Sequence, residues 1–345
     1  MLLVNLARIN LGFFPTPLQE LGNLSRVLGG SRIWVKREDL SGLASGGNKV
    51  RHLEFVLADI KSRGIDTIIS TSGSTQSNFC LQLAAAAHKL NMHAGFVFYG
   101  EYHPQVQGNL LLHKILNSKV KIIRSYYSSN VDKELNNMVQ EYLNMGHKPV
   151  IIKYNIGSAS GTDLHYRNLA VIGWAEGAGE LLHQLQAGKI DARYLIVSAG
   201  SCITSAGLIL GLKFLRSPVR LIGITASITK EEATKRIIEK ANTAADFMSW
   251  DVIIREEDIT IYDEYRAERN RRPTRGCLEA MKLVAQTEGF FLDPVYTGPT
   301  MAGLIDLMKK GIFTLEDTIV FFHTGGFPAV FTYDKEIISS CETDD

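Results

Sequence analysis

The sequence has no apolar run long enough to cross a membrane and no leader-like start. Its apolar beginning, MLLVNLARINLGFF, is interrupted by Asn5, Arg8 and Asn10, so neither a signal-peptide core nor a span of about 20 apolar residues is predicted. CxxC pairs and Cys/His clusters at zinc spacing are also missing. The four cysteines are scattered: Cys80, Cys202, Cys277 and Cys341. These absences predict reduced thiols, no disulfide framework, no metal site and a cytoplasmic protein.

An excess of charge of one sign is missing as well. The formal net charge is +1, so no long-range field favours nucleic acid or an anionic membrane as a partner. A small or mixed-charge ligand is the better expectation. Hydrophobic residues make up 45% of the chain and charged residues 21%, which excludes a disordered protein. With 345 residues, the chain is long enough for two domains.

Short apolar runs alternate with segments of helical period along the chain. Eight runs are predicted strands: Arg32–Lys36, Thr67–Ser70, Ala94–Tyr99, Lys121–Arg124, Val150–Tyr154, Tyr194–Ser198, Arg220–Thr225 and Thr318–His323. Several are hydrophobic throughout, which is typical of strands buried on both faces of a parallel sheet. Three segments are predicted helices: Lys49–Arg63, Phe79–Leu90 and Thr204–Leu215. This alternation predicts an α/β layered fold.

The first motif that could carry chemistry is SGGNKVRHLEF, at Ser45–Phe55. Gly46 and Gly47 allow a tight turn, and Lys49 follows at the start of a predicted helix. The partial positive charge of a helix N-terminus favours the neutral amine, the form that attacks an aldehyde to make a Schiff base. A solvated lysine on the first helical turn explains this motif equally well.

Two further motifs lead from a predicted strand into a predicted helix. STSGSTQSNF, at Ser70–Phe79, brings hydroxyl groups and backbone N–H groups to a helix start, which predicts an anion site. Simple helix capping by Ser77 or Asn78 is the alternative. Capping or solvent exposure is the better explanation of Ser74.

The motif SAGSCITSAG, at Ser198–Gly207, has small residues that permit close approach, so its helix start could hold a phosphate. It lacks the GK[ST] of a Walker A loop and is not GxGxxG, which favours a cofactor monophosphate over a nucleotide. LDPVYTGPTMAGL and FFHTGGFPA each place a hydroxyl, Thr297 or Thr324, beside glycines. His323 in the latter motif is interpreted as a core histidine with satisfied hydrogen bonds.

Taken together and in this order, these segments resemble the D-cysteine desulfhydrase and 1-aminocyclopropane-1-carboxylate (ACC) deaminase family. These are pyridoxal 5'-phosphate (PLP) enzymes of fold type II, the tryptophan-synthase-β-like group. The resemblance runs from FPTPL at Phe14–Leu18 to HTGG at His323–Gly326. It implies two α/β domains with parallel-type sheets and the cofactor in the interdomain cleft: a large domain of residues 1–49 and 161–345, and a smaller one of residues 50–160. It further implies a homodimer that acts on a small amino acid.

The resemblance also implies roles for individual residues. Lys49 would hold PLP as a Schiff base, and Lys49, Ser77 and Tyr296 would be catalytic. The cofactor would further contact Asn78, Ala199, Gly200, Ser201, Cys202, Ile203, Thr204, Thr297 and Thr324. The substrate would contact Gln76, Ser77 and Asn78.

The residue after Tyr296 helps to separate the branches of the family. ACC deaminases resemble VYEG, with a glutamate on the pyridine nitrogen, whereas this chain has Thr297 there, as D-cysteine desulfhydrases do. Thr324 agrees with that branch. A carboxylate keeps the ring a strong electron sink for opening a cyclopropane, while a hydroxyl suffices when a β-substituent leaves after α-proton loss.

Several positions depart from the family. Where the family usually has a lysine three residues after the Schiff-base lysine, this chain has His52. Where the family has a polar residue and an arginine, this chain has Phe79 and Leu81, and Ile203 replaces a glycine of the phosphate loop. A second tyrosine, in the loop over residues 264–275, aligns with Arg269 in an arginine-rich run. A solvated surface is one interpretation of this run. The other is that Arg269 binds an additional anionic group of the substrate.

The leading hypothesis is therefore a PLP-dependent lyase that removes the α-proton of a small amino acid, eliminates a β-substituent, and yields a keto acid and ammonia. ACC deamination is one alternative, and β/γ-replacement or cyclisation on a larger or anionic amino acid is another. A PLP-binding module without turnover is the non-enzymatic alternative. Lys49, Ser77, Asn78 and Tyr296 together argue against it, because a binder has little need of all four.

Overall fold

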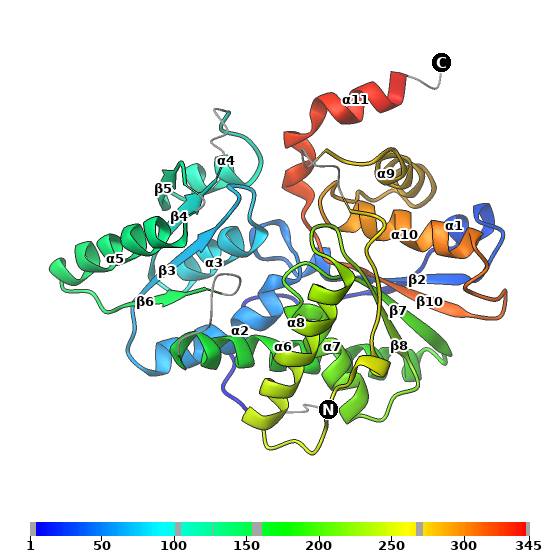
Figure 1. Cartoon of the computed structure of the whole chain (residues 1–345), viewed down its shortest axis with the longest axis horizontal. Coiled ribbons are helices and arrows are strands. Elements are labelled where there is room, and N and C mark those ends of the chain that lie inside the picture. The colour runs from blue at the N-terminus through cyan, green and yellow to red at the C-terminus, as the bar shows by residue number, and fades with distance from the viewer. Residues whose placement is uncertain (1–4, 101–104, 126, 154–160, 267–271, 343–345) are drawn as a thin grey trace.

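The computed structural model describes residues 5–100, 105–125, 127–153, 161–266 and 272–342, and it contains two sheets (Figure 1). The larger has the strand order β1-β2-β10-β7-β8-β9 and the smaller β5-β4-β3-β6. The strands are β1 Leu18–Glu20, β2 Arg32–Arg37, β3 Thr67–Ser72, β4 His93–Tyr99, β5 Lys119–Ile123, β6 Pro149–Ile152, β7 Ala192–Ser198, β8 Arg220–Ile224, β9 Thr260–Tyr262 and β10 Thr318–His323.

All strands except β1 pair in parallel with their neighbours. The eight predicted strands are confirmed, and so is the α/β class with parallel-type sheets. The two strands without a prediction, β1 and β9, are three residues long, which is too short for a periodic signal.

Helices cover both faces of each sheet. The α-helices are α1 Gly22–Val27, α2 Lys49–Ser62, α3 Asn78–Lys89, α4 Gly108–Ile115, α5 Ser128–Asn144, α6 Gly161–Ala187, α7 Ile203–Phe214, α8 Lys230–Phe247, α9 Arg275–Glu288, α10 Thr297–Lys309 and α11 Asp334–Glu342. Short 3₁₀ turns are η1 Glu38–Leu40, η2 Leu43–Ser45, η3 Glu256–Asp258 and η4 Phe327–Thr332. No α-helix within the described ranges has the length and apolar character needed to cross a membrane.

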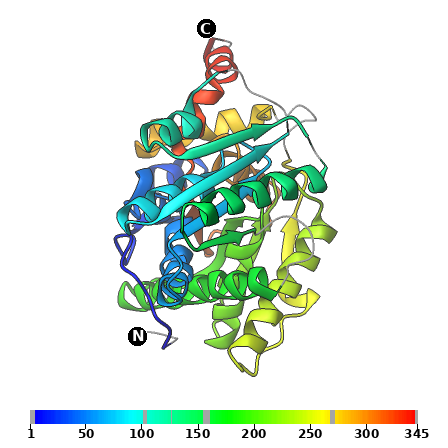
Figure 2. The ribbon, with the colours of Figure 1, turned by 90° about the vertical axis from the view of Figure 1, so that its left-hand side faces the viewer.

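One hydrophobic core joins the two sheets. Side chains of α2, α6, α7 and α8 pack on one face of the larger sheet, and the same cluster continues through α3 to Phe96 and Phe98 of β4 (Figure 1). A second core lies under α1, α9 and α10 on the opposite face of the larger sheet. A third lies between α5 and the smaller sheet, which faces the viewer in Figure 2.

The strands of the smaller sheet all fall between residues 67 and 152, and those of the larger sheet lie outside that range. The domain boundaries at residues 49/50 and 160/161 stay a prediction. Because β2, β10 and β7 are parallel neighbours, their carboxyl ends meet at one edge of the larger sheet. The segments after these strands therefore lie close together, and this is where α/β folds bind their ligands.

Candidate active site

The loop before Lys49 is held by contacts that only glycine permits. Gly46 has a φ of 81°, and a Cβ there would lie 1.7 Å from the carbonyl oxygen of Asp39. The N–H of Gly47 donates to the hydroxyl of Ser41 at 2.9 Å and to the carbonyl of Glu38 at 3.0 Å. The backbone that carries Lys49 is thus fixed against the segment after β2.

Lys49 is the first residue of α2, as the motif predicted. The residue as a whole is half-buried, yet burial lowers the pKa of its amine to about 8. Its side chain makes no hydrogen bond to the described residues. A substantial neutral fraction near neutral pH is what a nucleophilic or proton-accepting lysine requires. Desolvation is the cause of this shift, whereas the sequence argument invoked the helix N-terminus.

Asn48 joins three of the predicted segments. Its backbone N–H donates to the carbonyl of Thr324 at 3.0 Å, in the segment after β10. Its buried side-chain amide donates to the hydroxyl of Thr204 at 3.0 Å, at the start of α7. Lys49 therefore stands directly beside both the HTGG turn and the predicted phosphate loop.

The start of α7 presents an open set of donors. The backbone N–H groups of residues 200–205 donate no hydrogen bond to any residue in the described part of the chain. The hydroxyls of Ser198 and Ser205 are buried and likewise have no partner there. A Cβ on Gly200 would lie 3.3 Å from the ring of Tyr296, so the loop also needs a small residue. These residues fit the phosphate of a PLP-sized cofactor.

Tyr296 and Thr297 stand at the start of α10, with the ring of Tyr296 against Gly200 and 36% of the residue exposed. The buried carboxylate of Asp293 accepts hydrogen bonds from the N–H groups of Tyr296 and Thr297 at 2.9 and 2.8 Å. The hydroxyl of Thr297 donates to the same carboxylate at 2.6 Å and accepts from the Asp293 N–H at 2.7 Å. Thr297 is therefore engaged within its own turn.

The HTGG turn leaves the other threonine open. The hydroxyl of Thr324 makes no hydrogen bond to the described residues, although Thr324 is buried. His323 is buried beside it; its Nε2 contacts the carbonyl of Phe291 at 3.0 Å, and its Nδ1 accepts from Gly325 N–H at 3.2 Å. Burial lowers the pKa of His323, so a neutral ring is expected. The interpretation of His323 as a satisfied core histidine is confirmed.

The segment after β3 is capped by its own side chains. Ser77 is the N-cap of α3 and accepts from the N–H of Cys80 at 3.3 Å. Ser74 accepts from the N–H of Gln76 at 3.1 Å, a bond within the loop before α3 rather than a cap of the helix itself. Ser77 is therefore a helix cap, as the alternative explanation expected, and its predicted contact with a substrate stays a prediction.

Gln76 and Asn78 both meet Asn109 on α4. The side-chain oxygen of Gln76 accepts from the backbone N–H of Asn109 at 2.8 Å, and that of Asn78 accepts from its amide at 2.8 Å. One turn along α3, Gln82 is 2% exposed and donates to the carbonyl of Gly46 at 2.6 Å. This bond brings α3, with its Ser77–Asn78 start, to the loop that carries Lys49.

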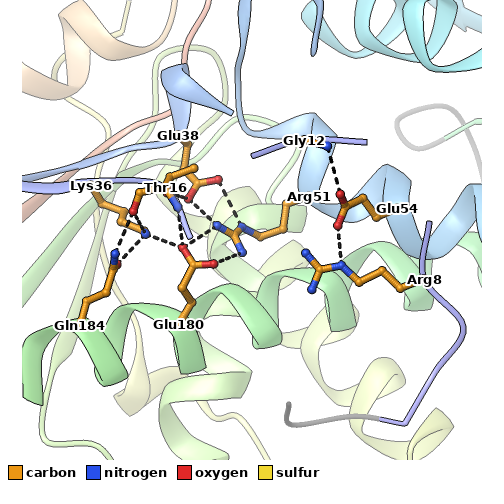
Figure 3. Close-up of polar contacts among 9 residues, drawn as sticks. All are labelled: Arg8, Gly12, Thr16, Lys36, Glu38, Arg51, Glu54, Glu180 and Gln184. Atoms are coloured by element: carbon orange, nitrogen blue, oxygen red, sulfur yellow. Dashed lines mark hydrogen bonds and ion pairs between the residues drawn. The ribbon is translucent and has the colours of Figure 1, made fainter. Parts of the chain in front are cut away.

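A buried ion-pair network anchors α2 through Arg51, two residues after Lys49 (Figure 3). Arg51 binds Glu38 at 2.8 Å and Glu180 of α6 at 2.9 Å, and Lys36 also binds Glu180. Burial would raise the pKa of Glu180, but Arg51 and Lys36 together lower it to about 2. Two cations and two carboxylates balance, so the network fixes α2 against α6 without leaving an unpaired charge.

Two of the positions that depart from the family, His52 and Phe79, lie close together. Their rings are 6.0 Å apart, and Leu81 is buried. Burial and the positive charge of Lys49 hold the pKa of His52 well below its usual value, so His52 is neutral. Arg269 lies outside the described residues, and its role stays a prediction.

Four residues of the site were not predicted from the sequence: Ser41, Gln82, Asn109 and Asp293. Gln82 had a signal, because it is the one uncharged polar residue within the apolar stretch CLQLAAAA. Asp293 also had one, since Asp before Pro favours a turn in which the carboxylate bonds to following N–H groups. Ser41 and Asn109 have no sequence signal, because their partners are set by tertiary packing.

Residues 9–325 match the family described as pyridoxal-phosphate dependent enzyme. The chain belongs to this family. Pyridoxal phosphate is accordingly its cofactor, and the chain is an enzyme. The open donors at the start of α7 and the desolvated Lys49 agree with the needs of that group.

Individual relatives cover nearly the whole chain. The D-cysteine desulfhydrases of Klebsiella pneumoniae and Salmonella choleraesuis are both 35% identical over 340 residues, covering 97% of this chain and 98% of each relative. A solved structure described as an ACC deaminase homologue is 31% identical with a TM-score of 0.84 and 97% coverage of both chains. O-ureido-L-serine synthase, at 16% identity and a TM-score of 0.65 over 96% of each chain, shares the fold.

Proposed function

We propose that this enzyme is a lyase that eliminates the β-substituent of a small amino acid of the D-cysteine type, releasing a keto acid and ammonia. The observation that carries the proposal is the position of Asn48, which places the desolvated Lys49 beside the open donors of α7. When bound, pyridoxal phosphate withdraws electrons from the substrate Cα, which makes the α-proton removable.

Lys49 would hold the cofactor covalently, and its free Nζ would take the α-proton of the substrate. A pKa of about 8 suits this role, because the amine is neutral often enough to accept a proton and basic enough to retain it. Gly46 and Gly47 permit the close backbone contacts that fix the start of α2, the helix that carries the Lys49 amine.

The start of α3 binds the substrate carboxylate in this proposal. Ser77 and Asn78 stand there, and the helix N-terminus favours an anion. The Ser77 hydroxyl can donate to the carboxylate while it accepts from the Cys80 N–H, since a hydroxyl has both capacities. Capping and substrate binding are therefore compatible.

The threonines favour β-elimination over ring opening of ACC. Neither Thr297, whose proton goes to Asp293, nor Thr324 can hold a proton on the pyridine nitrogen as a glutamate would. ACC should then be a poor substrate. ACC deamination remains the second candidate because the solved structure with the TM-score of 0.84 is described as an ACC deaminase homologue.

Two measurements test this function. Borohydride reduction of the yellow protein should fix the cofactor on the peptide that contains Lys49, and Lys49→Ala should abolish the adduct while Lys61→Ala, an exposed lysine of α2, retains it. Keto-acid release should be faster from D-cysteine or another β-substituted alanine than from ACC. An adduct on another lysine removes the proposal, and faster turnover of ACC reverses the choice of branch.

We also expect a cytoplasmic homodimer without nucleic-acid or membrane partners. The net charge of +1 supports the expected absence of those two partners.

Arg269 is a further candidate contact in this proposal, for an anionic group of the substrate. Arg269→Ala should then lower the specificity constant for an anionic β-substituted amino acid more than that for D-cysteine. An equal decrease in the specificity constants for both substrates would support the other interpretation, in which the arginine-rich run is a solvated surface.

A further inference from the structure

Lys240 is a buried cation that forms no ion pair with the described residues. It is 6% exposed and lies on the buried stripe of α8, between Ile237 and Ala241, where α8 packs on α6 and α7. Its ammonium makes no hydrogen bond to any residue in the described ranges. Lysine is almost never this buried unless it is paired. The position therefore requires an explanation.

Helix packing places Lys240 level with the start of α7. Helices α7 and α8 follow successive parallel strands and run in the same direction, and Phe214 stacks on Trp250 at 4.1 Å near their ends. At 1.5 Å per residue, Cys202 lies about 18 Å before Phe214, the last residue of α7, and Lys240 lies about 10 Å before Phe247, the last residue of α8. Lysine side chains point toward the helix N-terminus, which carries the ammonium toward the level of Cys202.

Helix α6 brings a second buried cation to the same level. A Cβ on Gly207 would lie 2.2 Å from the carbonyl of Val171, so α6 and α7 touch there, and Arg167 lies one turn before Val171. Arg167 is 9% exposed and binds Glu239 at 3.0 Å, while its Nε has no partner among the described residues.

The two acids of α8 near Lys240 each form an ion pair with an arginine. Glu239 binds Arg167, and Glu232 binds Arg236 at 2.6 Å. Burial raises the pKa of the Cys202 thiol to about 11, so Cys202 is neutral and offers no counter-charge. Among the described residues, no anion is therefore bound directly to both the positive end of α7 and the ammonium of Lys240.

We propose that Lys240 supplies the cation that neutralises the cofactor phosphate at the start of α7. The proposal rests on the proposed PLP site. Burial and the charge of Lys49 keep the pKa of His52 low, so this residue of α2 offers the phosphate no positive charge. Six consecutive residues of open N–H groups, 200–205, bind the phosphate oxygens, and Lys240 balances their charge from the α8 side.

The test compares ligands that differ only in phosphate. Dissociation constants of the apoprotein for PLP and for pyridoxal are measured in wild type, Lys240→Met, Lys240→Arg and the matched control Lys235→Met, an exposed lysine of the same helix. Lys240→Met should weaken PLP binding roughly 10- to 100-fold and leave pyridoxal binding unchanged. Lys240→Arg should restore part of the loss, and Lys235→Met should behave as wild type.

Inorganic phosphate provides a second readout that needs no cofactor. It should raise the melting temperature of wild-type and Lys235→Met apoprotein but not that of Lys240→Met. Lys240→Met should itself fold, because replacing a buried unpaired charge with an apolar side chain is not destabilising in the way that breaking an ion pair is.

Three results decide the matter. An unchanged PLP-to-pyridoxal ratio in Lys240→Met overturns the proposal while leaving the Lys49 adduct, and hence the proposed function, intact. Loss of inorganic phosphate binding with unchanged PLP affinity also overturns it, because the anion site would then be separate from the cofactor. A wild-type protein that binds neither PLP nor pyridoxal removes the proposed function together with this inference.

Discussion

The segments that precede α3 and α7 look alike in sequence and differ in their hydrogen bonds. Both follow a buried parallel strand and are rich in serine, threonine and glycine. Before α3, the hydroxyls of Ser72, Ser74 and Ser77 each accept from a backbone N–H of the same segment. Before α7, the N–H groups of residues 200–205 have no acceptor among the described residues.

This difference separates a site for an exchangeable ligand from one for a resident ligand. A self-capped helix start satisfies its donors when empty, so it can release a substrate carboxylate without leaving buried groups unpaired. An open helix start leaves its donors unpaired until an anion binds, which favours a phosphate that stays. A hydroxyl-rich turn in sequence therefore predicts an anion site, but only hydrogen bonding tells which kind.

The largest expected effect is that of Ser77→Ala, which removes one hydroxyl from the self-capped segment. The variant should lose about 2–4 kcal/mol of transition-state stabilisation, which is roughly 30- to 1000-fold in turnover, because we propose that the Ser77 hydroxyl binds the substrate carboxylate. The absorbance of the bound cofactor should stay unchanged, since the open segment before α7 is intact. Steady-state kinetics and the visible spectrum check both statements.

Thr229→Ala is the matched control, because Thr229 is not among the proposed site residues, caps α8 and accepts from the N–H of Glu232 at 3.3 Å. Both variants should lose about 1 kcal/mol of unfolding free energy from the lost cap, but only Ser77→Ala should lose turnover. Equal turnover in both variants would return Ser77 to a purely structural cap.

The second prediction concerns Lys49, which Asn48 links to α7 and Gln82 links, through Gly46, to α3. Because burial lowers its pKa to about 8, the neutral fraction rises with pH and saturates above that value. Capture of pyridoxal by the apoprotein should therefore accelerate about tenfold per pH unit below pH 8 and level off above it. Pyridoxal is used because its lack of phosphate removes one titrating group from the ligand.

A blocked lysine in solution should capture the aldehyde without levelling until about pH 10.4. A rate that keeps rising in the protein up to that pH would show that Lys49 is solvated. The segments before α3 and α7 would then not shield the Lys49 amine from water.

Most of the fold could be predicted from the sequence because its strands are buried on both faces. The run Ile319–Phe322 is apolar at every position, a pattern that solvent-facing strands do not allow, and the whole strand Thr318–His323 is buried. The three-residue strands β1 and β9 were missed because their hydrogen bonds to long neighbours, rather than their own pattern, define them.

In the candidate site, too, some residues could be predicted from local sequence and others depend on tertiary packing. Gly46, Gly47 and Lys49 could be found because tight turns restrict residue type locally. The side-chain amides of Gln82 and Asn109 donate to backbone carbonyls 36 and 33 residues away, so their roles arise from packing. The capped state of Ser77 and the open state of residues 200–205 also depend on backbone geometry that composition does not specify.

The smallest expected effect concerns the backbone of the open segment. Cys202, the N-cap of α7, has a φ of 65°, a left-handed conformation that costs a non-glycine residue about 1–2 kcal/mol, whereas Ser77 has a φ of −66° and no such strain. Cys202→Gly should exceed Cys202→Ala in unfolding free energy by about 0.5–1 kcal/mol, because the relieved strain outweighs the added entropy of the unfolded chain. Both variants keep the N–H group and should bind PLP as wild type does. Ala206→Gly, within α7, is the control and should lower the unfolding free energy by about 1 kcal/mol. Denaturant titrations of the apoproteins compare them, and a glycine variant less stable than the alanine variant would show that the open segment is unstrained.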